Sequence, residues 1–150
     1  MNQLNALSTV SLAETPMLWL LVVAAGAIIF SLVEAWLATL IVYGKVSALK
    51  KIFPATHNLI RSHIDYLMMA TLLSITYFIC QHLAIELPLW AIIILCFGAI
   101  YNPFGFLVKA INPQAGNADS IFGRVMVCVG FLPTTIGFVY PMAVILGRLL

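Results

Sequence analysis

The feature that most constrains the fold is a long apolar run over residues 17–43, interrupted only by Glu34 and by small polar side chains. A helix that crosses a bilayer needs about 20 consecutive, mostly apolar residues. Inside lipid the backbone must satisfy its own hydrogen bonds, and a helix does so within a single segment. The run therefore predicts a membrane-spanning helix, which Gly44 ends.

The composition of the chain agrees with a membrane protein. Its 150 residues are 63% hydrophobic and 8% charged, with a mean hydropathy of +1.11, whereas soluble domains are about half apolar and a quarter charged. We therefore expect one integral membrane domain over residues 1–150, with the lipid bilayer as its surroundings. The net charge of +2 is too small to indicate a nucleic-acid partner.

Three further apolar segments predict three more spanning helices, at residues 58–81, 87–110 and 120–149. The third helix carries an expected interruption at Asn102-Pro103, and the fourth carries expected bends near Pro133 and Pro141. The predicted fold class is thus an all-α membrane protein with four transmembrane helices forming a bundle. A unit this small encloses a ligand poorly, so we expect it to oligomerise.

Two local patterns refine the helix ends. Ser11 to Glu14 has the spacing of a capping box, and Thr15-Pro16 resembles a helix start. Between the first two spanning helices, three apolar residues fall on one helical face and precede Pro54, which predicts a short amphipathic turn on the membrane surface. These residues are Val46, Leu49 and Phe53.

The cations are distributed unevenly. Six of them flank the first and third loops, whereas Arg148 lies on the other side; the six are Lys45, Lys50, Lys51, Arg61, Lys109 and Arg124. Cytoplasmic loops carry the excess of Lys and Arg. We therefore expect a protein of the bacterial inner membrane with loops one and three in the cytoplasm.

His63 is the strongest candidate for a metal ligand. It lies just inside the predicted cytoplasmic end of the second helix, within residues 57–69, where a basic loop runs into apolar sequence. A neutral imidazole is a good iron ligand, and a proximal histidine is common in haem proteins. The alternative that stays open is a helix-end histidine that extends to water.

Several residues could complete a haem site around His63. Tyr66 follows it by three and shares its helical face, and Met68 or Met69 offers a thioether for the sixth iron position. Cations near the surface are available for the haem propionates: Arg61, Lys109 and Arg124.

Other polar residues leave two interpretations each. Glu34, near the middle of a spanning helix, is either functional or a protonated acid hydrogen-bonded between helices. Asn102 either bonds backbone groups freed by Pro103 or faces a substrate cavity. Three cysteines inside apolar runs are expected to be core residues rather than disulfide or zinc sites: Cys80, Cys96 and Cys128.

Short motifs from Arg61 to the C-terminus follow a recognisable order. They are Arg61-Ser62-His63, Asn102-Pro103-Phe104-Gly105-Phe106, an Asn/Pro/Gly loop at residues 112–117, Asp119-Ser120-Ile121-Phe122, and Pro133. In this order the chain resembles the styrene oxide isomerase family of small four-helix membrane proteins.

The resemblance implies a homotrimer with haem b between subunits and with His63 as the iron ligand. It also implies an enzyme that isomerises a small apolar epoxide, in which ferric haem acts as a Lewis acid and Asn102 serves the substrate. Three positions differ from the family: Met69 replaces an asparagine, Gly98 stands near the place where the family has an acid, and Phe106 replaces a tyrosine. These differences remove polar groups that would orient an epoxide. The alternative expectation is therefore a non-catalytic b-type haem protein that serves electron transfer, haem handling or sensing.

Overall fold

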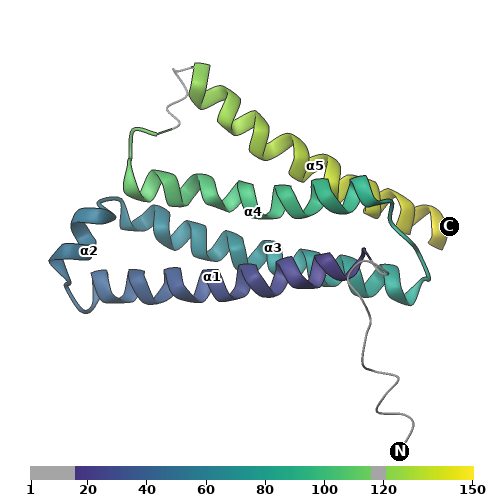
Figure 1. Cartoon of the computed structure of the whole chain (residues 1–150), viewed down its shortest axis with the longest axis horizontal. Helices are drawn as coiled ribbons and strands as arrows, with labels where there is room; N and C mark the ends of the chain where they lie inside the picture. The colour runs from purple at the N-terminus through teal and green to yellow at the C-terminus, as the bar shows by residue number, and fades with distance from the viewer. Residues whose placement is uncertain (1–15, 116–120) are drawn as a thin grey trace, which may run out of the picture.

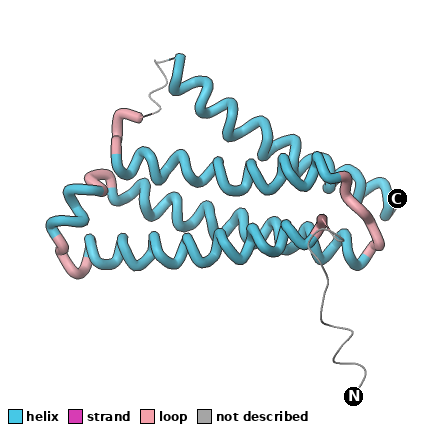
Figure 2. The backbone as a smooth tube through the Cα atoms, viewed as in Figure 1, coloured by secondary structure: helices cyan, strands magenta, loops and turns pink. Residues whose placement is uncertain are grey.

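The structure is a computed structural model that describes residues 16–115 and 121–150. These residues form five helices and, within the described ranges, no strand (Figures 1 and 2). The helices are α1 (Leu18–Val42), α2 (Ser47–Ile52), α3 (Thr56–His82), α4 (Leu89–Ile111) and α5 (Ile121–Leu149).

The long helices are arranged as a bundle in which α3 packs between α1 and α4, while α5 packs mainly against α4 (Figure 1). The buried positions of α1 recur every three or four residues, which places them on one stripe of the helix. They are Leu20, Ala24, Ala27, Ser31, Glu34, Ala38 and Ile41. Most are small, and small side chains let two spanning helices approach closely.

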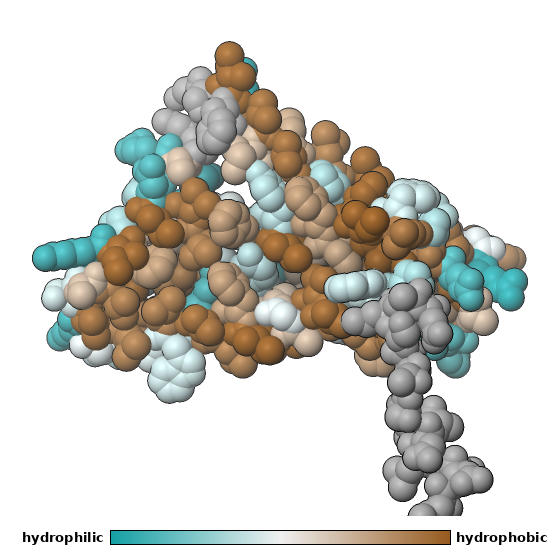
Figure 3. All heavy atoms as spheres, viewed as in Figure 1, coloured by the Kyte–Doolittle hydropathy of each residue, from teal (hydrophilic) through white to brown (hydrophobic). Residues whose placement is uncertain are grey.

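The outer surface of the bundle is apolar. Ile29 is 66% exposed, Trp36 68% and Phe78 62%, and hydrophobic side chains cover much of the face shown in Figure 3. Four helical segments are long and apolar enough to cross a membrane: Leu18–Val42, Thr56–His82, Leu89–Ile111 and Gly123–Leu149. The predicted all-α bundle with four spanning helices is confirmed, and the chain is an integral membrane protein.

The predicted amphipathic turn is the short helix α2. Leu49 and Phe53 pack against a small cluster formed by α1, α3 and α4, whereas Val46 is 37% exposed. The predicted caps at Ser11 to Glu14 and Thr15, and the predicted start of the last helix at Ser120, lie outside the described residues.

The expected interruption at Asn102-Pro103 is wrong, because α4 is continuous through Pro103. Hydroxyl groups on α3 support the carbonyls around this proline. Ser62 Oγ lies 3.2 Å from the Pro103 carbonyl oxygen, and the Tyr66 hydroxyl donates to the Ile100 carbonyl at 3.1 Å. These bonds tie the proline-containing turn of α4 to α3, and spanning helices that pack against neighbours commonly tolerate proline.

Two glycines bring α4 and α5 into backbone contact. A Cβ added to Gly98 would lie 2.7 Å from Thr134 Cα, and one added to Gly137 would lie 2.8 Å from Leu95 Cα. Toward the α4–α5 connection the two helices separate (Figure 1), and a Cβ on Gly105 would meet nothing within 4 Å. The pair is therefore closed at one end and open at the other.

The first and third loops lie at the same end of the bundle. The Ala55 amide donates to the Ala110 carbonyl at 3.2 Å, and Asn58 Nδ2 donates to the Lys109 carbonyl at 3.4 Å. These bonds join the start of α3 to the end of α4. The six cations predicted to lie on one side of the membrane thus come from one end of the molecule.

Candidate functional site

His63 is half-buried on α3 and its ring faces α1. The Nδ1 atom lies 2.9 Å from the Ser31 carbonyl oxygen and 2.7 Å from Ser31 Oγ. Ser31 Oγ in turn donates to the His63 carbonyl at 3.2 Å. Because a carbonyl oxygen can only accept a hydrogen bond, the 2.9 Å contact with the Ser31 carbonyl favours the tautomer that carries its proton on Nδ1.

This tautomer makes His63 suitable as a metal ligand. With Nδ1–H donated to Ser31, the Nε2 lone pair is free, and no hydrogen bond within the described part of the chain occupies it. Histidines that bind metals usually donate their other ring N–H to a carbonyl or carboxylate, which fixes the ring and its tautomer. Ser31 fills this orienting role for His63.

The surface of α3 beside His63 is apolar and open. Two neighbours one turn away on its helical face expose their side chains, Ile60 by 40% and Leu67 by 36%, and the adjacent Ile64 is 54% exposed. Exposed apolar residues beside an imidazole nitrogen that makes no hydrogen bond form a surface on which a flat hydrophobic group can pack. A single chain covers only one side of such a group.

Glu34 lies in the interior one helical turn from Ser31. Its side chain is 1% exposed, and its Oε1 lies 2.7 Å from Ser62 Oγ, the same oxygen that approaches the Pro103 carbonyl at 3.2 Å. Its Oε2 is buried with no hydrogen-bond partner in the described ranges. The acid therefore joins α1 to α3 and, through Ser62, to α4.

The number of protons available around Ser62 indicates whether Glu34 is protonated. The Ser62 hydroxyl has one proton but two acceptor oxygens beside it. Both contacts become hydrogen bonds if Glu34 is protonated and donates to Ser62 Oγ, which then donates to the Pro103 carbonyl. A neutral carboxyl also avoids the cost of a charge inside the bilayer. This arrangement favours the second of the two interpretations of Glu34, a protonated acid between helices.

Two of the predicted haem-site residues lie in the core. The Tyr66 side chain is 4% exposed, its hydroxyl bonds the Ile100 carbonyl, and its ring meets Phe30 edge-on with centroids 5.0 Å apart. Met69 is 6% exposed within the main apolar cluster, so its thioether is not presented beside His63. Met68 is 49% exposed and remains accessible.

The predicted propionate partners are distributed over different surfaces. Arg61 is exposed, but residues two apart on a helix point in nearly opposite directions. Its side chain therefore points away from the His63 ring. Arg124 is exposed on α5, and Lys109 lines a cavity between α4 and α5.

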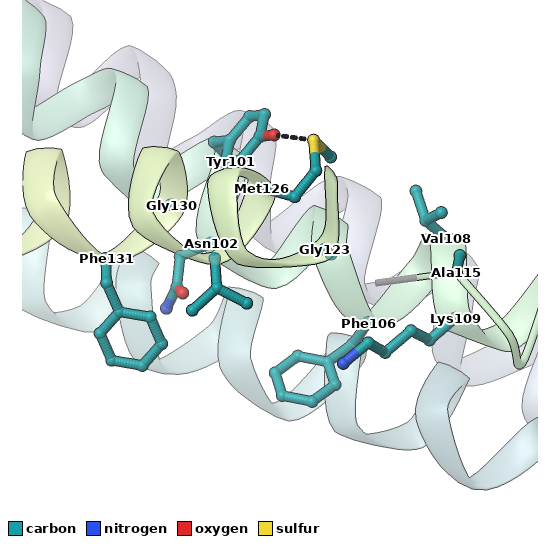
Figure 4. Close-up of a pocket in the computed structure, with 12 residues that line it drawn as sticks. Tyr101, Asn102, Phe106, Val108, Lys109, Ala115, Gly123, Met126, Gly130 and Phe131 are labelled. Atoms are coloured by element: carbon teal, nitrogen blue, oxygen red, sulfur yellow. Dashed lines mark hydrogen bonds between the residues drawn. The ribbon is translucent and has the colours of Figure 1, made fainter. Parts of the chain in front are cut away.

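Asn102 also lines this cavity, which has a volume of about 150 Å³ (Figure 4). Its carboxamide makes no hydrogen bond within the described residues, so a role in bonding the backbone near Pro103 is not observed. Asn102 faces a cavity, as the other interpretation requires, and a substrate for that cavity stays a prediction. However, His63 faces α1, and the structure does not bring it and Asn102 into one site within a chain.

Sequence reasoning did not find the serines that position the site. Ser31 lies three residues before Glu34, and Ser62 lies directly before His63. Small polar residues in spanning helices often bond across helix interfaces, so their spacing relative to Glu34 and His63 was a usable signal. The identity of their partners required the structure.

The cysteines and acids give no sign of a multi-residue metal centre. All three cysteines are free; Cys80 is buried, Cys96 is half-buried and Cys128 is exposed. The prediction that the cysteines lie in the core is therefore confirmed for Cys80 and wrong for Cys128. Among the described residues no group of three or more His, Cys, Asp or Glu side chains is placed to hold a metal ion. Because haem iron needs only an axial ligand from the protein, this finding concerns metal sites with several protein ligands and does not test haem binding.

Comparison with known proteins gives no match. No family model, no curated protein and no solved structure matches the chain. The resemblance to styrene oxide isomerases rests on the short motifs in the sequence.

Proposed function

We propose that this protein binds haem b and that His63 is the axial ligand of the iron. The observation that carries the proposal is the Ser31 pair of contacts, at 2.9 Å and 2.7 Å, which holds His63 Nδ1 and leaves Nε2 available. The apolar surface beside the ring suits a porphyrin face. The motif Arg61-Ser62-His63 supports the same assignment by its resemblance to styrene oxide isomerases.

The open surface around His63 supports an assembly. A porphyrin on this surface has one face against α3, and the other face needs protein to separate it from lipid. A second copy is the simplest source of that cover, and its exposed Arg61 is a cation available to a propionate. We therefore propose a homotrimer with haem between subunits, as the resemblance implies.

The assembly is tested by native mass spectrometry of the protein released from detergent. We expect a trimer that carries haem and loses it on dissociation, because separation removes the cover from one porphyrin face. A population made up only of haem-loaded monomers would contradict both the trimer and the shared site.

Two activities are compatible with a haem on His63. In the first, ferric haem supplies a Lewis acid to a small apolar epoxide-like substrate, and Asn102 orients that substrate. This requires a neighbouring copy to bring its Asn102 to the haem, because His63 and Asn102 lie on different helix pairs of one chain. In the second, the protein is not catalytic and serves electron transfer, haem handling or sensing.

The absorption spectrum of the purified protein separates these activities. A high-spin, five-coordinate ferric spectrum leaves an iron position open for substrate and supports the isomerase. A low-spin, six-coordinate spectrum supports the non-catalytic protein, because a second axial ligand closes the site. Of Met68 and Met69, only Met68 is exposed, so a Met68 from a neighbouring copy is the candidate for that role, and a thioether ligand raises the reduction potential.

We also propose that loops one and three face the cytoplasm of a bacterial inner membrane. Six of the seven cations come from that end, and positive residues are retained on the cytoplasmic side. Reporter fusions at Lys51 and Gln114 test the orientation. We expect cytoplasmic activity at both positions, and periplasmic activity at both would reverse the orientation while leaving the helix count unchanged.

A further inference from the structure

The cavity between α4 and α5 has polar groups at two depths. On α4 its lining recurs at three- and four-residue spacing, so Asn102, Phe106 and Lys109 share one face. Figure 4 shows the Lys109 side chain beside the Phe106 ring, with Asn102 farther along the helix. Lys109 follows Asn102 by seven positions, which corresponds to about 10 Å along a helix axis.

The space arises from the way α4 and α5 diverge. Gly98 and Gly137 close one end by backbone contact, whereas Gly105 has nothing within 4 Å of an added Cβ. A space of about 150 Å³ is the size of a benzene ring, so this cavity suits part of one hydrocarbon chain.

Both polar groups lack protein partners in the described part of the chain. The Asn102 carboxamide makes no hydrogen bond, and the Lys109 ammonium has no acidic partner. The Tyr101 hydroxyl at the same cavity, in contrast, donates to Met126 Sδ at 2.8 Å. A purely apolar ligand would leave the carboxamide without a partner, at a cost of a few kcal/mol. A small polar ligand would be desolvated against Phe106 and Phe131.

We propose that this cavity binds a single-chain amphiphile with an anionic head, namely a fatty-acid-like carboxylate that enters from the bilayer. The carboxylate pairs with Lys109 near the end of α4. The chain passes Phe106 and Val127, and a hydroxyl or carbonyl oxygen on the chain hydrogen-bonds Asn102. The proposal rests on the cavity and does not require haem.

The experiment uses photoaffinity labelling of the full-length protein in neutral phosphatidylcholine nanodiscs. The probe is a long-chain fatty acid with a mid-chain diazirine, and the matching fatty alcohol is its uncharged counterpart. We expect the acid to label peptides of α4 and α5 around Phe106 and Val127. Lys109→Gln should lower labelling by the acid about tenfold and leave the alcohol unchanged, since a charge-assisted pair is lost. Lys51→Gln, at the same end but outside the cavity, is the matched control.

Two further variants test the space and the carboxamide. Gly105→Leu fills the cavity and should abolish labelling, whereas Gly26→Leu adds the same side chain to open space on α1 and should not. A mid-chain hydroxy fatty acid should compete better than the unsubstituted acid, and Asn102→Leu should remove that preference. The acid–alcohol comparison needs only the wild-type fold, so it stands even if Gly105→Leu fails to fold.

Several results would overturn the proposal. Equal labelling by acid and alcohol in the wild type would assign the cavity to neutral lipid. Labelling spread over α1 and α3 would show non-specific contact with the bilayer. Labelling of dissociated monomers but not of the assembled protein would show that a neighbouring copy occupies the cavity. The same measurements on His63→Ala protein separate this proposal from the haem assignment.

Discussion

His63→Ala protein is expected to purify without a Soret band. The substitution removes the ring whose Nδ1 is held by Ser31 at 2.9 Å and 2.7 Å, and with it the free Nε2 that the iron needs. No other described histidine is held in this way, because His57 and His82 are exposed at the two ends of α3. The measurement is the ratio of Soret to protein absorbance after expression with excess haem.

Four matched variants make this result specific. His57→Ala and His82→Ala should keep the wild-type spectrum. Ser31→Ala should retain haem, because its backbone carbonyl still accepts the Nδ1 proton, but the loss of the hydroxyl should shift the reduction potential. Arg61→Ala should weaken haem retention without abolishing it, since an exposed ion pair contributes little. Full haem occupancy and an unshifted spectrum in His63→Ala protein would show that the haem site lies elsewhere.

Glu34→Ala is expected to destabilise the bundle by about 3 kcal/mol, because it leaves a cavity between α1 and α3 and removes a partner of Ser62. The wild-type acid is 1% exposed and lies 2.7 Å from Ser62 Oγ. Thermal unfolding of the purified protein in detergent measures the effect. Leu32→Ala, which truncates an exposed side chain on the same helix, is the control and should change stability little.

Glu34→Gln tests the protonation state proposed for this acid. A carboxamide has the shape of a neutral carboxyl and can donate an N–H to Ser62 Oγ, so its stability should stay within about 1 kcal/mol of the wild type. If the glutamine variant were as unstable as the alanine variant, the carboxyl would have to be ionised in the fold. Retained haem in Glu34→Gln protein would further show that the acid supports packing rather than the ligand.

The position of each helix was predictable from local sequence, and the bonds between the helices were not. The predicted spans differ from α1, α3, α4 and α5 by at most two residues at any end that the structure describes. The exception was Pro103, where a break was expected. Local sequence indicates the hydrogen bond that a proline removes, but the hydroxyls of Ser62 and Tyr66 that support nearby carbonyls come from another helix.

The candidate site, too, was predictable only in part from the sequence. The sequence places His63 within a predicted spanning helix. It also carries the resemblance to a haem family and the cations near the interface. The sequence also suggested Tyr66 and Met69 as neighbours of the haem. Only the packing of α3 between α1 and α4 shows that both face the core, because rotation about the helix axis is fixed by neighbouring helices.

The sequence by itself determined that this chain is a bundle of four membrane-spanning helices, because the length and apolarity of a segment decide whether it can satisfy its backbone in lipid. The tertiary structure decided which polar atoms meet. It placed Ser31 against His63 Nδ1, Ser62 between Glu34 and Pro103, and Asn102 with Lys109 in a cavity opened by the divergence of α4 and α5. These contacts depend on close approach and rotation of helices far apart in sequence, which no local pattern specifies.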